Sequence, residues 1–171
     1  MSGVRVRPET AADHARVDEI QRAAFGRDEE AALVRALRAQ ARPQISLVAE
    51  RAGRLVGHVF LSPVTIEGPA SPPPVGGLAP VGVDPEHQGQ GVGSALVRAG
   101  LREAAAIGWQ AVFLLGDPAY YARFGFTLAA PAGLRYESEL FDPAFQTIEL
   151  VPGALAGQRG WIRYHDAFRG V

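Results

Sequence analysis

A strand, a glycine-rich loop and a helix follow one another in a single segment, and this order constrains the fold more than any other feature. The apolar run Leu78–Val83 predicts the strand, and an apolar stripe along Gly91–Gly108 predicts an amphipathic helix. Pro80 removes one backbone donor, which predicts an edge, a bulge or a splayed position there. Three alternating glycines join strand to helix: Gly89, Gly91 and Gly93. The segment predicts a domain of the α/β class.

The glycine loop predicts a site for a phosphate or pyrophosphate. The first N–H groups of a helix lack partners within the helix and lie at the positive end of its dipole. Glycines let a ligand approach this backbone closely. Two nucleotide motifs fit poorly, because the chain has no GK[ST] and because Ser94 stands where a Rossmann pattern counted from Gly89 needs its last glycine. A glycine-rich turn without a ligand remains the alternative.

Two residue types are missing, and their absence limits the chemistry. The chain has no Cys, and its 17 residues of the Lys and Arg class are all Arg. Disulfides, cysteine nucleophiles and a Schiff-base lysine are therefore excluded. An enzyme of this composition is expected to join two bound substrates directly. The four His lack metal-binding spacing such as HExxH, so no metal site is expected.

Charge and hydropathy limit the partners and the location. The formal net charge is −1 and no basic cluster stands out, so no nucleic-acid partner is expected. The chain lacks a run of about 18 apolar residues, so no membrane span is expected. The N-terminus does not resemble a signal peptide, and a cytoplasmic location follows as the expectation.

The remaining elements are predicted from apolar periodicity and turn residues. Further strands are expected at Val4–Arg7, Ile45–Glu50, Leu55–Leu61, Ala111–Leu115, from Gly125 onward, and in the tail at Phe145–Leu150 and Trp161–Tyr164. Further helices are expected at Ala11–Phe25, Asp28–Ala41 and Asp117–Arg123. The length of 171 residues, without a repeat, predicts one domain, 1–171.

Two motifs resemble one known family. Gln88-x-x-Gly91-x-Gly93 resembles the Gln/Arg-x-x-Gly-x-Gly/Ala signature of the GNAT superfamily of N-acetyltransferases. Tyr121-Ala122-Arg123-Phe124-Gly125-Phe126 resembles that family's Tyr-x-Lys/Arg-x-Gly-Phe segment, and it follows in the expected order. The resemblance covers roughly Val4–Phe126. It implies a three-layer α/β (α+β) fold with a mixed, mostly antiparallel sheet, splayed at the acetyl-CoA site and flanked by about four helices.

The resemblance also implies a donor and its binding residues. Acetyl-CoA would give its acetyl group to an amine, with the pantetheine arm on the main chain of Val81, Gly82 and Val83. The pyrophosphate would lie on the backbone amides of Gln88, Gly89, Gln90, Gly91, Val92, Gly93 and Ser94. Tyr120, Tyr121 and Phe124 would also line the cofactor site. Tyr121 is the expected acid for the departing thiolate, although Tyr120 could face the sulfur instead.

Several alternatives stay open. The candidates for a general base are His58, Glu67, Glu86, His87 and Asp117, and solvent is a further option. The acceptor is expected to be a small-molecule or peptide amine held by Phe25–Arg42, Glu67–Pro74 and Phe141–Trp161. Rival readings are a non-catalytic acyl-CoA-binding module and a nucleotide-phosphate-binding α/β protein. The sequence leaves the oligomeric state open, a homodimer included.

Overall fold

The computed structural model describes residues 3–171, so Met1 and Ser2, the start of the predicted domain, lie outside the described residues. The helices are α1 (His14–Phe25), α2 (Glu29–Gln40), α3 (Val92–Ala106) and α4 (Pro118–Tyr121). The strands are β1 (Val4–Pro8), β2 (Ile45–Arg51), β3 (Arg54–Glu67), β4 (Val75–Val83), β5 (Ala111–Leu115), β6 (Thr127–Leu128), β7 (Leu134–Arg135), β8 (Phe145–Glu149) and β9 (Gly160–Arg163). Within the described residues, β3 continues past Leu61, β4 begins before Leu78, and β7 is an addition.

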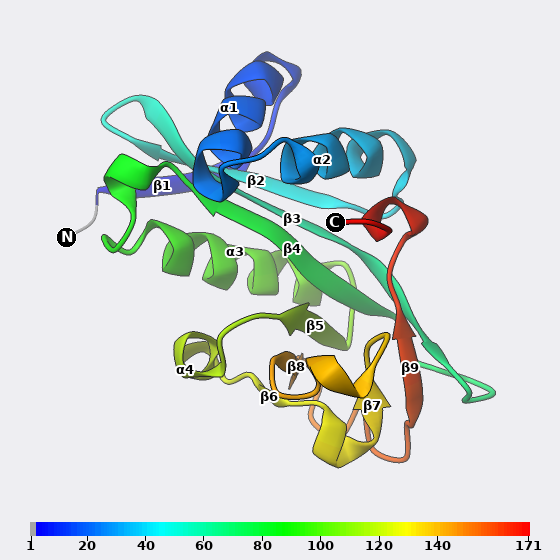
Figure 1. The fold of residues 1–171 in the computed structure, drawn as a ribbon. Helices are drawn as coiled ribbons and strands as arrows, with labels where there is room; N and C mark the ends of the chain where they lie inside the picture. Colours follow the sequence, from blue (N-terminus) through cyan, green and yellow to red (C-terminus); the bar gives the residue numbers. More distant parts are fainter. Residues whose placement is uncertain (1–2) are drawn as a thin grey trace.

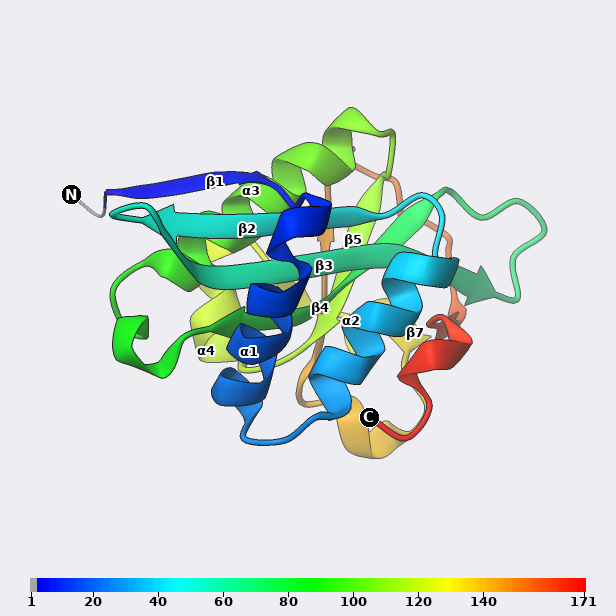
Figure 2. The same cartoon turned by 90° about the horizontal axis from the view of Figure 1, so that it is seen from above.

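The strands form one mixed sheet between two layers of helices. Its order is β1-β2-β3-β4-β5-β8-β6, with β9 joined to the end of β3 and β7 to β9. The parallel pairs are β4–β5 and β7–β9, and the other pairs are antiparallel. Helices α1 and α2 cover one face of the sheet and α3 covers the other (Figures 1 and 2). The predicted fold class is confirmed.

The central strands β4 and β5 separate soon after they meet. They pair only from Val75 to Gly77 on β4, and the rest of β4 pairs with β3 alone. Two aromatic rings press on β4 where it is still paired: a Cβ at Gly76 would lie 2.2 Å from the Trp109 ring, and a Cβ at Gly77 would lie 2.6 Å from the Tyr164 ring. Successive residues of a strand face opposite sides of the sheet, so the two rings hold β4 from both faces. Beyond them the strands splay, as predicted.

The tail returns across the molecule instead of ending beside the last strands of the sheet. Strand β9 pairs antiparallel with Thr65–Glu67 at the far end of β3. The following turn, Asp166–Phe168, brings Phe168 against the apolar cluster shared by α1, α2, β2 and β3. Figure 1 shows this last segment beside α2. The sequence predicted β9 itself but not the pairing that carries the tail back.

A buried polar chain lies between the sheet and helices α1 and α2. The Gln21 Nε2 lies 2.8 Å from His58 Nδ1, and His58 Nε2 lies 2.8 Å from Ser46 Oγ. Ser46 Oγ donates in turn to Glu9, which also accepts from Arg38. These contacts are all satisfied when neutral His58 carries its proton on Nε2. Full burial lowers the pKa of His58 to about 4 despite the opposing charge of Glu9.

His58 is expected to make stability depend on pH. The pKa of His58 is about 4 in the folded protein and about 6.5 in the unfolded chain. Between pH 4 and pH 6.5 the unfolded chain therefore binds more protons than the folded protein. The free energy of unfolding should fall as pH drops from 6.5 towards 4, by about 3 kcal/mol in the limit. Urea unfolding of the wild type and His58→Gln at pH 4.5–6.5 measures this. Equal pH slopes in the two proteins would contradict it.

Candidate active site

The glycine loop forms one end of the site, at the start of α3. Gly91 caps the helix with φ of 87°, and Gly89 has φ of 73°, a left-handed region that glycine enters without steric cost. Around them lies a cavity of about 250 Å³, here called the loop cavity. It is lined by Val83, His87, Gln88, Gly89, Gly91, Gly93, Ser94, Tyr120 and Arg123.

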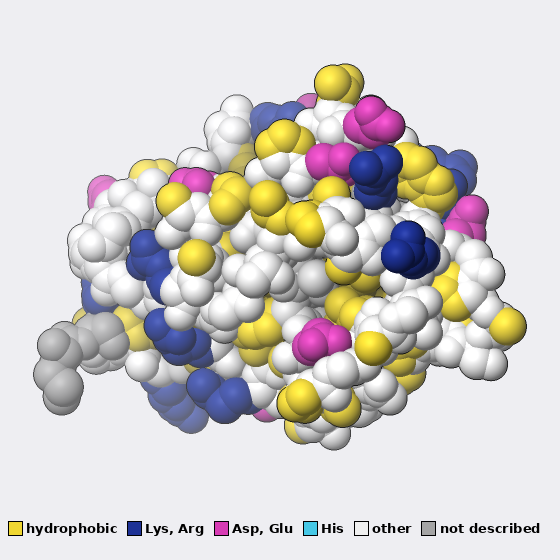
Figure 3. Space-filling model, turned by 90° about the horizontal axis from the view of Figure 1, so that it is seen from below, with side chains coloured by type: hydrophobic (Ala, Val, Ile, Leu, Met, Phe, Trp, Pro, Cys, Tyr) yellow, Lys and Arg dark blue, Asp and Glu magenta, His cyan; other side chains and the backbone are white. Residues whose placement is uncertain are grey.

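Positive charge lies near this end of the molecule. Arg123 lines the loop cavity, and its guanidinium carbon lies 4.2 Å from the centre of the Tyr120 ring. Arg98 stands over Phe124 in the same way, at 4.8 Å. Figure 3 shows arginine side chains on the side of the molecule on which Figure 1 draws α4, and others towards the opposite side. The unpaired amides at the start of α3 and these arginines together favour an anionic ligand.

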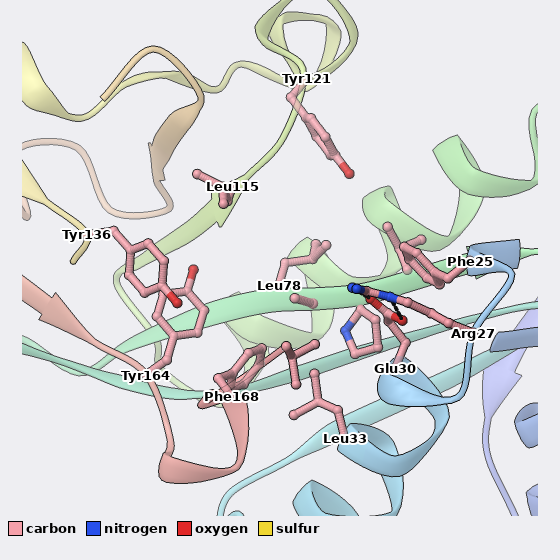
Figure 4. Close-up of a pocket in the computed structure, with 14 residues that line it drawn as sticks. Phe25, Arg27, Glu30, Leu33, Leu78, Leu115, Tyr121, Tyr136, Tyr164 and Phe168 are labelled. Carbon is pink, nitrogen blue, oxygen red and sulfur yellow. Dashed lines mark hydrogen bonds and ion pairs between the residues drawn. The ribbon is translucent and has the colours of Figure 1, made fainter. Parts of the chain in front are cut away.

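The other end of the site is a pocket of about 350 Å³ where β4 and β5 part, here called the splay pocket. Strand β4 contributes Leu78–Val81, β5 contributes Leu115, and Tyr121 enters from α4 (Figure 4). The other walls come from the α1–α2 region and from the tail: Phe25, Arg27, Glu30, Leu33, Tyr136, Tyr164, Phe168 and Val171.

A third hollow joins the two ends. This bridging cavity, of about 300 Å³, shares Val83, Gln88, Gly93 and Tyr120 with the loop cavity. With the splay pocket it shares Phe25, Val81 and Tyr121. A continuous path therefore runs along the free edge of β4 from the helix N-terminus to the splay pocket.

Tyr120 and Tyr121 face different parts of this path. The Tyr120 hydroxyl lies 3.2 Å from Ser94 Oγ, over the glycine loop. Tyr121 directs its hydroxyl into the splay pocket (Figure 4), and its ring packs so closely on Gly116 that a Cβ there would lie 2.5 Å away. Burial, with a smaller effect of Tyr120, raises the pKa of Tyr121 to about 12. Its hydroxyl stays protonated at neutral pH and can donate to a developing anion.

Four other predicted cofactor residues have different surroundings. The Gln90 side chain contacts Arg51, outside the loop cavity. Val92 is buried in the core under α3, so only its backbone could meet a ligand. Gly82 faces Gln21, since a Cβ at Gly82 would lie 2.6 Å from Gln21 Oε1. Phe124 packs on Tyr120 and Tyr121 and supports both rings.

None of the predicted general bases lines the splay pocket. His58 is buried among Gln21 and Ser46, and Glu67 forms an exposed ion pair of 2.5 Å with Arg163. Asp117 accepts from the Ala119 amide and so caps α4. Glu86 and His87 belong to the turn before the glycine loop, and His87 lines the loop cavity.

Glu30 is the carboxylate side chain that does line the splay pocket, and the sequence analysis missed it. The residue is only 5% exposed, and Arg27 binds both of its oxygens, at 2.9 and 2.5 Å. A signal was present in the sequence: Glu30 stands three, four and seven residues before Leu33, Val34 and Leu37 on the buried face of α2. A carboxylate on an apolar helix face is rarely without a partner or a role.

The segments predicted to hold the acceptor differ in whether they line the splay pocket. The Phe25–Arg42 region supplies Phe25, Arg27, Glu30 and Leu33 to it. Glu67–Pro74 and Phe141–Trp161 supply no lining residue of that pocket, because β9 carries later residues there instead. These are Tyr164, Phe168 and Val171, together with Tyr136 after β7.

The described residues give no sign of a metal centre. Across residues 3–171, no group of three or more Asp, Glu, His or Cys side chains is placed to hold a metal ion. Over the same residues, none of the helices is both long and apolar enough to cross a membrane.

Comparison with known proteins finds similar sequences over most of the chain. A family model described as an acetyltransferase (GNAT) domain matches residues 5–129. The uncharacterized N-acetyltransferase YhbS of Escherichia coli K12 is 39% identical over 164 residues, covering 95% of this chain and 97% of YhbS.

Two crystal structures are similar over nearly the whole chain. The structure of Escherichia coli YhbS in complex with CoA has a TM-score of 0.88 and 38% identity, covering 96% of this chain and 91% of that one. A GNAT family acetyltransferase from Brucella melitensis in complex with acetyl-CoA has a TM-score of 0.78 and 34% identity, covering 98% and 99%.

The contact between Gly116 and Tyr121 can be tested by a double-mutant cycle. Gly116 is outside the positive-φ region, so alanine is tolerated by the backbone, but its Cβ would overlap the Tyr121 ring. Gly116→Ala should destabilise the wild type by about 1–3 kcal/mol. The same change should cost clearly less in a Tyr121→Leu background, as measured by urea unfolding. Additive effects would mean that the ring does not rest on Gly116.

Proposed function

The chain belongs to the GNAT family of acetyltransferases, and from this premise we propose that it transfers the acetyl group of acetyl-CoA directly to an amine of a small molecule or peptide. One observation carries the proposal: the continuous path from the glycine loop to the splay pocket, along the unpaired edge of β4. Both substrates would be bound together, and residues 1–171 would act as one domain. The absence of Cys and Lys supports transfer without a covalent intermediate.

The donor would lie along this path. Its pyrophosphate would accept hydrogen bonds from backbone amides of Gln88–Ser94, with Tyr120 beside them. Its pantetheine arm would run through the bridging cavity and pair with the free edge of β4 at Val81–Val83, as an added strand does. The thioester would then reach the splay pocket beside Tyr121.

The reaction would depend on the positioning of both substrates and on stabilising the negative charge that develops on the carbonyl oxygen and on the departing sulfur. A neutral amine attacks the thioester carbonyl, and a backbone N–H of β4 beside the splay pocket polarises that carbonyl. When the carbon–sulfur bond breaks, the Tyr121 hydroxyl donates a hydrogen bond to the departing sulfur. Because the pKa of Tyr121 is about 12 and that of a free thiol is about 8.5, Tyr121 would stabilise the thiolate without becoming tyrosinate. Holding both substrates in line supplies much of the remaining acceleration.

Thiol release from acetyl-CoA with a panel of amines tests the proposed activity. Release should require an amine and should yield the N-acetylated product by mass spectrometry. Calorimetry with CoA, ATP and NAD should give the tightest binding for CoA. Binding of CoA without turnover across the panel would favour the non-catalytic module, and tighter binding of ATP or NAD would favour the nucleotide-binding alternative.

Tyr121→Phe tests the role of the hydroxyl in the splay pocket. We expect kcat to fall by about 10²-fold, the low end of the range for acid–base groups, with little change in the dissociation constant of acetyl-CoA. Tyr120→Phe is the matched control: it removes the contact with Ser94 and should change binding more than kcat. An unchanged kcat in Tyr121→Phe would remove Tyr121 from the mechanism.

A further inference from the structure

The splay pocket holds one acidic and one basic side chain in a lining that is otherwise apolar and aromatic. Five aromatic side chains line the pocket, together with Leu33, Leu78 and Leu115. The aromatic residues are Phe25, Tyr121, Tyr136, Tyr164 and Phe168. Of the lining side chains, Glu30 and Arg27 alone carry full charges. What enters this pocket must therefore match one charged position and a large apolar surface.

Glu30 and Arg27 differ in how firmly the fold holds them. The Glu30 carboxylate is almost fully buried, whereas half of the Arg27 side chain is exposed to solvent. A buried carboxylate needs a cationic or donor partner at all times, because leaving it unpaired is costly. The exposed guanidinium can move away only if another cation takes its place. A cation that enters the pocket could therefore take the place of Arg27 on Glu30.

The opposite wall is aromatic and uncharged. Tyr136 and Tyr164 meet edge to face at 5.1 Å, and Tyr164 meets Phe168 at 5.0 Å. Burial raises the pKa of Tyr136 to about 12 and that of Tyr164 further, so both hydroxyls stay neutral. This wall offers ring faces and edges to an apolar body. It offers no charge to pair with a second ammonium or a phosphate.

We propose that the acceptor is a primary amine carried on an aromatic or branched apolar body, and that Glu30 binds its ammonium group and removes a proton. The inference rests on the proposed function and names the acceptor class of that same site. Arg27 releases Glu30 as the amine enters, and the body of the acceptor packs on Tyr136, Tyr164 and Phe168. Figure 4 shows Tyr121 and the Arg27–Glu30 pair on opposite sides of the pocket. Tyr121 would face the departing sulfur, and Glu30 would face the attacking amine.

The protons balance in this scheme. Glu30 takes one proton from the ammonium, and the neutral nitrogen attacks the acetyl carbon of the thioester. The new carbon–nitrogen bond forms as the carbon–sulfur bond breaks. The nitrogen loses a second proton, one of the two protons ends on the CoA sulfur, and the other passes to solvent. The products are the N-acetylated amine, CoA with a free thiol and one proton.

The acceptor class is tested first with the wild-type protein and acetyl-CoA. Arylalkylamines and branched alkylamines should have kcat/KM values about 100-fold above those of a linear polyamine or an amino sugar. Turnover that favours the polyamine or the amino sugar would overturn the inference and leave the proposed activity intact. Absence of turnover with every amine would instead count against the proposed activity, and with it the inference that rests on it.

Glu30→Gln tests the proton acceptor, and Glu29→Gln is its matched control. Glu29 is the preceding residue on α2, half-exposed, and lies 3.5 Å from Arg27. With an arylalkylamine at neutral pH, Glu30→Gln should lower kcat/KM about 10²- to 10³-fold, and Glu29→Gln less than about 3-fold. Equal losses in the two variants would overturn the role of Glu30.

Two further measurements separate chemistry from folding. An O-alkylhydroxylamine with the same apolar body is unprotonated at neutral pH, so Glu30→Gln should retain most of the wild-type rate with it. A loss as large as that with the ammonium substrate would contradict a proton-transfer role. Phe168→Ala leaves Glu30 in place and should lower kcat/KM for the arylalkylamine about 10-fold while sparing methylamine. An unchanged preference would remove the aromatic wall from the inference.

Discussion

The parting of β4 from β5 is the constraint on which the rest of the molecule depends. A strand edge inside a protein must find partners for its amides and carbonyls, and beyond Gly77 the edge of β4 finds none on β5. The Trp109 and Tyr164 rings pack on β4 where it still pairs with β5, and the two strands part beyond that point. The glycine loop lies at the far end of that opening and the splay pocket near its start. The path from the glycine loop to the splay pocket is the space left where β4 and β5 no longer pair.

Different layers of the protein supply the two sides of the splay pocket. Tyr121 comes from the segment after β5, and its ring packs against Gly116 because that residue has no side chain. Glu30 comes from α2, on the other side of the central strand. Tyr121 and Glu30 therefore reach one cavity from separate elements. Burial keeps the Tyr121 hydroxyl protonated, and Arg27 binds the Glu30 carboxylate.

The sequence predicted best what is encoded locally. The glycine loop, α3 and the Tyr121 segment are short patterns whose meaning does not depend on distant residues, and the structure places them around one path. Glu30 was missed because acidic residues are common in the first turn of a helix, so its place on the buried face of α2 did not stand out. Strand β7 has two residues, too few for any periodicity. The return of the tail could not be foreseen, because the contact of Glu67 with Arg163 joins residues 96 positions apart.

That long-range pairing has a consequence for how the protein is made. A chain emerging from the ribosome can complete β1–β5 and α3, and hence the glycine loop, while residues 160–168 are still unmade. The tail wall with Tyr164 and Phe168 forms when β9 pairs with β3. This pairing is slow because it must first close a loop of nearly a hundred residues. The glycine loop can therefore form before the tail wall of the splay pocket. A chain that ends before β9 would keep the residues of the glycine loop and lack Tyr164, Phe168 and Val171 of that pocket.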